Sequence, residues 1–180
     1  MKVILHICCG VCAAGAADVL LKEGHRVTGY FYNPNIYPEE EYVLRLEAAR
    51  RTAEHLGFDL VEGIYEPGNW ISAVAAFQDE PEGGQRCLIC YRVRIVNSYN
   101  YMIAAGADAF TSTLTISPHK SAKAINRIGS EIGGNSFMAR DFKKKDGFKK
   151  AAEMAKSWGI YRQHYCGCEY SLQVGGVDGR

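Results

Sequence analysis

The chain has 180 residues, of which 47% are hydrophobic and 23% charged, with 21 Lys and Arg residues against 20 Asp and Glu residues. These fractions are those of an ordinary globular domain, so they exclude a disordered segment, a collagen-like repeat and a coiled coil. The net charge of +1 excludes a uniformly basic nucleic-acid-binding protein, although a local basic face can be hidden in the sum.

A strand–loop–helix–strand unit opens the chain. Residues 2–7 are apolar and partly β-branched, which predicts a buried strand, and residues 13–23 place apolar side chains on one face of a predicted helix that stops at Gly24. A second strand is predicted over residues 26–32. Two strands joined by a helix in this way pair in parallel through a right-handed crossover.

The alternation of helices and strands continues along the chain. The later predicted elements are a helix over 38–55, a strand over 58–62, a helix over 67–79, a loop over 80–85, a helix over 87–105, a strand over 108–114, and helices over 120–132 and 147–158. Because the sequence has no internal repeat or linker, this pattern predicts one α/β domain over residues 1–180, built as three layers around a parallel sheet. Only the tail from about residue 175 is expected to be flexible.

The seven cysteines are the unusual feature of the composition. They occupy positions 8, 9, 12, 87, 90, 166 and 168, an odd number in three tight groups that fits poorly with the disulfide framework of a small secreted protein. The first residues lack the long apolar stretch of a secretory signal, and no run approaches the roughly 20 apolar residues that a membrane helix needs. A cytoplasmic location without membrane contact is therefore expected, where thiols stay reduced unless they are catalytic or bind metal.

The first two cysteine groups lie where a metal site is expected. The loop at residues 8–12 follows the first strand, and parallel sheets bind ligands beyond the carboxyl ends of their strands. This loop carries thiols instead of residues that approach phosphate, and the chain has neither a Walker A nor a GxGxxG motif, so no nucleotide cofactor is expected. Cys87 and Cys90 begin a predicted helix, whose N-terminus favours thiolates. With Cys8 and Cys9 they supply four ligands, the number used by an iron–sulfur cluster or a structural zinc site, whereas buried cysteines that only pack are the third interpretation.

Cys12 and the third cysteine group add further thiols. Cys12 is either a spare ligand or a small residue that faces the first helix. In an extended segment residues two apart face the same side, so Cys166 and Cys168 are expected to point together, with Gly167 relaxing the backbone between them. This pair can cycle between dithiol and disulfide or complete a metal site, and the spacing favours neither role.

A basic segment at residues 140–150 holds six positive and two negative charges, with Phe142 and Phe148 among them. Cations that bind phosphate and rings that stack on bases together suit a single-stranded RNA loop, although a run of lysines can also be a solvated face. The segment at 117–120 follows the last predicted strand and either contacts the substrate or only begins the next helix. The candidate substrate-binding or RNA-binding residues are Ser117, His119, Lys120, Lys143, Lys144, Lys145, Tyr161 and Arg162.

Five blocks of sequence resemble a known family. They read LHICC at 5–9, RCxxCYxxR at 86–94, TLxxSPHK at 113–120, DFKKKDGFK at 141–149 and YRQHYCGC at 161–168. Together they resemble the QueH family, the cobalamin-independent epoxyqueuosine reductases of the last step in queuosine tRNA modification. The blocks lie in the family's order and span nearly the whole domain.

The resemblance implies a fold, a cofactor and a set of ligands. The fold would be similar to the adenine nucleotide alpha-hydrolase-like (HUP) group, and the cofactor would be a [4Fe-4S] cluster, with no cobalamin. Carried over by position, the cluster ligands would be Cys8, Cys9, Cys87 and Cys90, and the redox-active pair would be Cys166 and Cys168. Cys12, with an acidic residue of 79–82, would be a ligand for a second iron or zinc ion.

The implied reaction converts the epoxide of epoxyqueuosine to the alkene of queuosine at the wobble position of a tRNA anticodon. It consumes two electrons and two protons and releases the oxygen as water. The implied partners are tRNA bearing epoxyqueuosine and an electron donor that the sequence does not identify. Two other functions fit the same cysteines and lysines, namely a zinc-stabilised RNA-binding module without redox chemistry and a thiol–disulfide oxidoreductase.

Overall fold

A parallel sheet forms the centre of the computed structural model, which describes residues 1–175. Its strands run in the order β3-β2-β1-β4, and Leu5 at the centre pairs with Gly29 on one side and Thr111 on the other. The strands are β1 (Lys2–His6), β2 (Arg26–Phe31), β3 (Asp59–Glu62) and β4 (Ala109–Ser112). All four were expected from the sequence, and each begins or ends within two residues of its predicted bounds.

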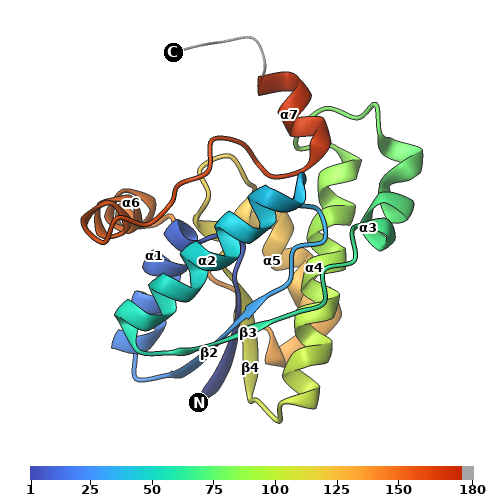
Figure 1. Cartoon of the computed structure of the whole chain (residues 1–180). Coiled ribbons are helices and arrows are strands. Elements are labelled where there is room, and N and C mark those ends of the chain that lie inside the picture. Colours follow the sequence, from blue (N-terminus) through green and yellow to red (C-terminus); the bar gives the residue numbers. More distant parts are fainter. Residues whose placement is uncertain (176–180) are drawn as a thin grey trace.

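Helices cover both faces of the sheet, which confirms the predicted three-layer α/β architecture (Figure 1). One face is covered by α1 (Gly10–Lys22), α2 (Glu39–Leu56) and α6 (Gly147–Ser157), and the other by α4 (Gln85–Ala104) and α5 (Ala122–Gly133). The smaller elements are α3 (Pro67–Val74), α7 (Glu169–Gly175), and the short 3-10 helices η1 (Ala75–Phe77), η2 (Thr113–Ile116) and η3 (Gly134–Ser136). The tail predicted to be flexible lies outside the described residues, and over residues 1–175 no helix is long and apolar enough to cross a bilayer.

Local hydrogen bonds move several element boundaries from their predicted positions. The last strand ends at Ser112, because the Ser112 side chain accepts a hydrogen bond from the Leu114 amide and starts η2. Helix α5 begins only after Ser121, whose hydroxyl caps it by accepting from the Ala124 amide. The alternative in which Ser117 and Pro118 begin this helix is therefore wrong.

Two further differences concern the helices. Helix α1 starts three residues earlier than predicted, because the Cys9 sulfur accepts a hydrogen bond from the Cys12 amide and caps the helix. The helix predicted over 67–79 ends at Val74 and continues as η1, and α7 was not predicted from the sequence.

Small residues let α1 approach its neighbours closely. A Cβ atom added at Gly10 would lie 2.7 Å from the backbone oxygen of Ala48 in α2, and one at Gly15 would lie 2.7 Å from the Cβ of Ala151 in α6. Helix α1 is consequently buried along most of its length between the sheet, α2 and α6. This close packing fixes the start of α1, and with it the cysteine loop, over the carboxyl end of β1.

The side chain of His6, at the end of β1, contacts Tyr32 after β2 and Ser112 at the end of β4. The ring is fully buried, with Nε2 3.1 Å from the carbonyl oxygen of Tyr32 and Nδ1 2.9 Å from the hydroxyl of Ser112. A carbonyl can only accept, so Nε2 carries the proton and Nδ1 accepts from the hydroxyl. Burial, and then the nearby charge of Arg94, lower the pKa of His6 to about 3.

The neutrality of His6 makes stability depend on pH. In the unfolded chain a histidine takes up a proton below about pH 6.5, whereas native His6 stays neutral down to about pH 3. We therefore expect His6 to reduce the free energy of unfolding as the pH falls from 6.5, by about 1.4 kcal/mol per pH unit. Urea unfolding at several pH values should show a shallower dependence in His6→Gln than in the wild type. Equal slopes in the two proteins would contradict this prediction.

Candidate active site

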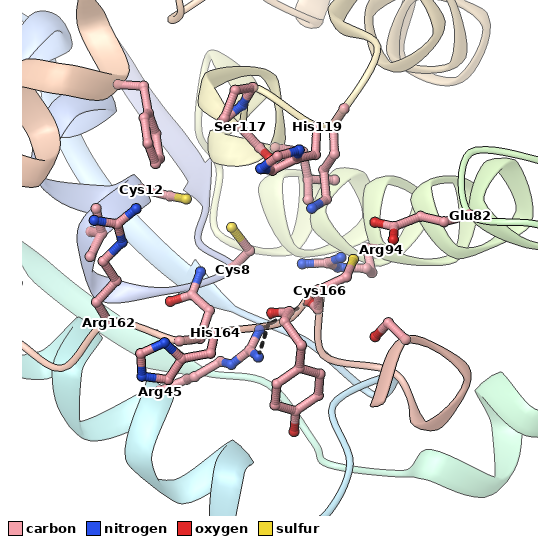
Figure 2. Close-up of a pocket in the computed structure, with 18 residues that line it drawn as sticks. Cys8, Cys12, Arg45, Glu82, Arg94, Ser117, His119, Arg162, His164 and Cys166 are labelled. Carbon is pink, nitrogen blue, oxygen red and sulfur yellow. Dashed lines mark hydrogen bonds between the residues drawn. The ribbon is translucent and has the colours of Figure 1, made fainter. Parts of the chain in front are cut away.

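A cavity of about 820 Å³ opens at the carboxyl ends of β1 and β4. Its wall combines the cysteine loop, the segment after η2, one side chain each of α2, α4 and α6, the loop before α4, and the segment before α7 (Figure 2). This is the position at which parallel α/β sheets bind ligands. The volume lies within the range of about 300–1,000 Å³ of small-molecule sites.

Three thiols gather at the turn from β1 into α1. The sulfurs of Cys8, Cys9 and Cys12 all lie within 4.8 Å of one another, and those of Cys8 and Cys9 are 3.9 Å apart. The turn brings them together because Cys9 caps α1 while Cys12 lies one helical turn further on. The hydroxyl of Thr113 lies 3.3 Å from the Cys8 sulfur and joins this group to the carboxyl end of β4.

The pKa values of the three thiols are shifted in different directions. Hydrogen bonds with Cys12 and Cys9, helped by the charges of Arg94 and Lys120, hold the pKa of Cys8 well below its usual value. Hydrogen bonds with Cys8 and Cys9, and burial, raise the pKa of Cys12 well above it. For Cys9 the hydrogen bond with Cys12 lowers the pKa, but the bond with Cys8 and burial outweigh it and raise the pKa to about 12. Cys8 is therefore the thiol of this group that deprotonates first.

Cys87 and Cys90 lie at the start of α4, as predicted, but outside the three-sulfur group. The Cys87 sulfur accepts a hydrogen bond from the Gly83 amide, and Cys90 is buried beside Trp70 and Cys168. The helix start was expected to favour thiolates. Burial instead raises the pKa of both thiols, that of Cys90 to about 11, because desolvation outweighs the nearby positive charge.

Cys166 and Cys168 face different surroundings. The segment before α7 forms no strand, and Gly167 between the two cysteines bends the backbone with a positive φ of +126°. Cys166 lines the cavity, whereas Cys168 is buried against Trp70 with its sulfur 3.5 Å from the Ser171 hydroxyl. The expectation that spacing makes the two thiols point together is therefore not met.

Two cations face the thiols without a carboxylate partner. Arg94 is 3% exposed, and its guanidinium donates to the Asn33 side chain at 2.6 Å and lies 4.0 Å from the Cys90 sulfur. Among the side chains that the structure describes, none of the Asp or Glu oxygens lies within 4.0 Å of the charged nitrogens of Arg94 or Lys120. A buried cation is costly without an opposite charge, and metal-bound thiolates would supply it. The soft donors and the uncompensated cations thus fit an anionic, thiolate-bound metal centre.

The other predicted site residues divide into two sets. Ser117, His119, Lys120 and Arg162 line the cavity, and Arg162 lies over the ring of Phe148, 5.6 Å from its centroid. The remaining predicted site residues do not line the cavity, namely Lys143, Lys144, Lys145 and Tyr161.

Those outside the cavity wall have other contacts. Tyr161 donates its hydroxyl to Glu41 at 2.7 Å, and Lys143 donates to the backbone oxygen of Lys120 at 2.9 Å. Lys144 and Lys145 are exposed, and the predicted stacking residue Phe142 is instead buried in the core.

Three basic residues of the cavity received no role from the sequence, although one signal was available. They are Arg45, Arg94 and His164. Arg94 follows Cys90 by four residues, and on a helix that spacing places both on one face. Glu82 belongs to the acidic run named above as a source of a metal ligand. Arg45 and His164 gave no comparable signal.

Comparisons with known proteins identify the family. A protein-family model described as "Epoxyqueuosine reductase QueH" matches residues 3–174. The chain belongs to the QueH family. Relatives of this name share 32% identity in Streptococcus pyogenes serotype M1 (98% of this chain, 72% of the relative) and 34% in Thermotoga maritima (94% and 90%). Membership of the QueH family makes the chain an oxidoreductase.

Solved structures confirm the fold. A predicted subunit of tRNA methyltransferase from Methanocaldococcus jannaschii superposes with a TM-score of 0.59 at 13% identity, covering 85% of this chain and 76% of that one. An NMN synthetase from Francisella tularensis gives 0.52 at 15% identity, covering 88% and 62%. At these identities the similarity speaks for the fold alone, and it is the HUP-type fold that the resemblance implied.

The uncompensated charge of Arg94 leads to a prediction for this QueH protein. Removing it with Arg94→Gln should weaken metal retention about 10–100-fold, as loss of groups that support metal ligands commonly does. Arg94→Lys, which keeps the charge, should retain more metal. The measurement is the metal content of anaerobically purified protein during titration with a chelator.

Arg92→Gln is the matched control, because Arg92 lies on the same helix but is exposed and paired with Glu131. Unchanged metal retention in a folded Arg94→Gln protein would refute a role for this charge.

Proposed function

We propose that the protein reduces epoxyqueuosine to queuosine in the anticodon of tRNA, using a [4Fe-4S] cluster held by Cys8, Cys9, Cys87 and Cys90. The observation that carries this proposal, beside family membership, is that Cys8, Cys12 and Cys166, from opposite ends of the chain, line one cavity together with Arg94 and Lys120. The epoxide gains two electrons and two protons, both C–O bonds break, a C=C bond forms, and water leaves. A cluster of this kind supplies electrons one at a time.

A second iron or zinc ion at Cys12 is part of the same proposal. The Cys12 sulfur lies within 4.8 Å of the Cys8 and Cys9 sulfurs but is not one of the four proposed cluster ligands. Glu82 also lines the cavity and offers a carboxylate. Cys12 therefore has a proposed role distinct from that of the four cluster ligands.

Residues of the cavity wall would bind and protonate the substrate. Burial lowers the pKa of the Lys120 ammonium, but negative charge at Cys166 and Cys8 raises it more, so Nζ keeps its protons and can donate a hydrogen bond to the oxygen that leaves. Cys166, as one member of the proposed redox pair, lies in another part of the wall. Ser117 and His119 supply polar contacts beside them.

The tRNA would approach over the rim that carries the basic segment. Arg162 stacked on Phe148 presents a cation and a planar group at the cavity, and exposed Lys144 and Lys145 belong to the preceding segment. An anticodon loop is already single-stranded, so its base can enter the cavity at a lower cost than a base drawn from a duplex.

The metal content tests the proposal directly. We expect anaerobically purified protein to contain iron and acid-labile sulfide and to reduce epoxyqueuosine in tRNA with a chemical reductant. Cys8→Ser and Cys90→Ser should lose sulfide and activity, whereas Cys12→Ser should keep the sulfide. The measurements are metal analysis, electron paramagnetic resonance and nucleoside analysis of the tRNA.

Two outcomes would overturn it in favour of another function. Colourless protein with stoichiometric zinc and full tRNA affinity would identify a zinc-stabilised RNA-binding module. Thiol–disulfide exchange without metal, abolished by Cys166→Ser, would identify a thiol–disulfide oxidoreductase.

The basic segment gives a second test. Lys144→Gln/Lys145→Gln should weaken tRNA binding and reduce the slope of log affinity against log salt by about 1.4, because each phosphate contact to a single strand contributes about 0.7. Lys143 is left intact, since it supports the Lys120 backbone. The matched control is Lys2→Gln/Lys22→Gln, which removes two exposed lysines near the amino-terminal end of the sheet. Equal slopes in all three proteins would mean that the segment is only a solvated face.

A further inference from the structure

One arginine holds the backbone on both sides of Cys166. The Arg45 side chain is 3% exposed, and its two terminal nitrogens donate to the carbonyl oxygens of Cys166 at 3.0 Å and Tyr165 at 3.1 Å (Figure 2). Its guanidinium also lies over the Tyr165 ring, 5.0 Å from the centroid. A planar fork of donors can hold two adjacent carbonyls at once, which a lysine ammonium does less well.

Glu41 fixes the orientation of that arginine. One carboxylate oxygen of Glu41 accepts from Nε of Arg45 at 2.6 Å, and the other accepts from the hydroxyl of Tyr161 at 2.7 Å. Glu41 and Arg45 are four residues apart on α2, which puts them on one face of the helix. The carboxylate and the guanidinium are both buried, so their hydrogen bonds are strong and directional.

The turn between the two cysteines packs directly against this arginine. A Cβ atom at Gly167 would lie 2.9 Å from a terminal nitrogen of Arg45, and the Gly167 carbonyl accepts from the Tyr37 amide at 2.8 Å. The left-handed backbone at Gly167 directs Cys166 to the cavity and Cys168 to the cluster around Trp70. A disulfide needs Cβ atoms about 3.8 Å apart with converging side chains. Both cysteines are free thiols in the structure, and closing a disulfide between them would have to change the turn that Arg45 holds through two carbonyls and its contact at Gly167.

We propose that Arg45 is a positioning residue that keeps Cys166 and Cys168 apart as two thiols, with Cys166 facing the substrate. The inference rests on the proposed function, in which these two cysteines are a redox pair. When the pair is oxidised by glutathione disulfide, the two thiols lose two electrons and two protons, one S–S bond forms, and two molecules of glutathione are released. Arg45 opposes this step because its hydrogen bonds hold the backbone in the dithiol arrangement.

The experiment measures the dithiol–disulfide equilibrium in anaerobically purified, metal-containing protein. Protein equilibrated in glutathione buffers of different ratios is quenched with acid and alkylated, and mass spectrometry quantifies the peptide that contains both cysteines. Arg45→Gln should shift the equilibrium toward the disulfide by about tenfold or more, because two hydrogen bonds from a charged group are lost. Arg45→Lys should shift it less.

Arg51→Gln is the matched control on the same helix. Arg51 donates to the carbonyl oxygens of Trp158 and Gly159 at 3.0 and 3.2 Å, and so binds two adjacent carbonyls of a different segment. Its loss should leave the equilibrium unchanged. Tyr161→Phe removes only the phenol that supports Glu41 and should shift the equilibrium in the same direction as Arg45→Gln, with the melting temperature measured alongside.

An equilibrium constant in Arg45→Gln equal to that of the wild type would overturn the proposal, as would the absence of any disulfide in both proteins. If Arg45→Gln does not fold, Tyr161→Phe decides in the same way. A disulfide that forms more readily in the variants than in wild-type and Arg51→Gln protein would support it. Iron, sulfide and the reduction of epoxyqueuosine are measured separately, so a failure of the proposed function is distinguished from a failure of this inference.

Discussion

Positive charge buried beside thiols is the constraint on which the site depends. Arg94 is held in place by Asn33, whose amide in turn donates to the carbonyl of Ile7 just before the cysteine loop, so the end of β1 fixes both the cation and the sulfurs that face it. Neutral thiols would leave that cation uncompensated in a region of low dielectric. Thiolates bound to metal remove the problem, since the ligands are then permanently deprotonated. The cations and the cysteines therefore belong to one site and depend on each other for charge balance.

The parallel sheet explains how cysteines so distant in sequence reach one place. In a parallel sheet the carboxyl ends of all strands lie at the same end of the sheet, so the turns after β1 and β4 are neighbours. The hydrogen bond between Thr113 and Cys8 joins them. The segment before α7 lines the cavity, while Cys168 at its end packs with Cys90 of α4 against Trp70 of α3. The close packing of Gly10 against α2 holds the first group at this edge, so the position of the site is set by features of the core.

The local pattern of the sequence predicted most of the fold and part of the site. Periodicity predicted the strands. The rule that ligands bind at the carboxyl ends of parallel strands then predicted, from the sequence alone, that Cys8 and Ser117 lie near one site. The parts of the site that local sequence pattern could not predict depend on tertiary contacts. The spacing of Cys166 and Cys168 predicts a shared side only for an extended chain, and the backbone at Gly167 is set by contacts with a helix more than a hundred residues earlier. The spacing of Glu41 and Arg45 indicates a pair on one helix face, but it does not show that both side chains are buried.

The net charge of the protein is only +1, yet several cations line the cavity. The hydrogen-bond partners of the buried arginines explain how both statements hold. Arg86 donates to the backbone oxygens of Gln78 and Glu80 and lies over the Tyr170 ring, while Arg94 uses the amide oxygen of Asn33. Neutral acceptors satisfy the donors without cancelling the charge. Arg45, which must hold a backbone in place, is instead neutralised by Glu41. Carboxylates elsewhere balance the sum, whereas the cavity keeps positive charge beside its thiols.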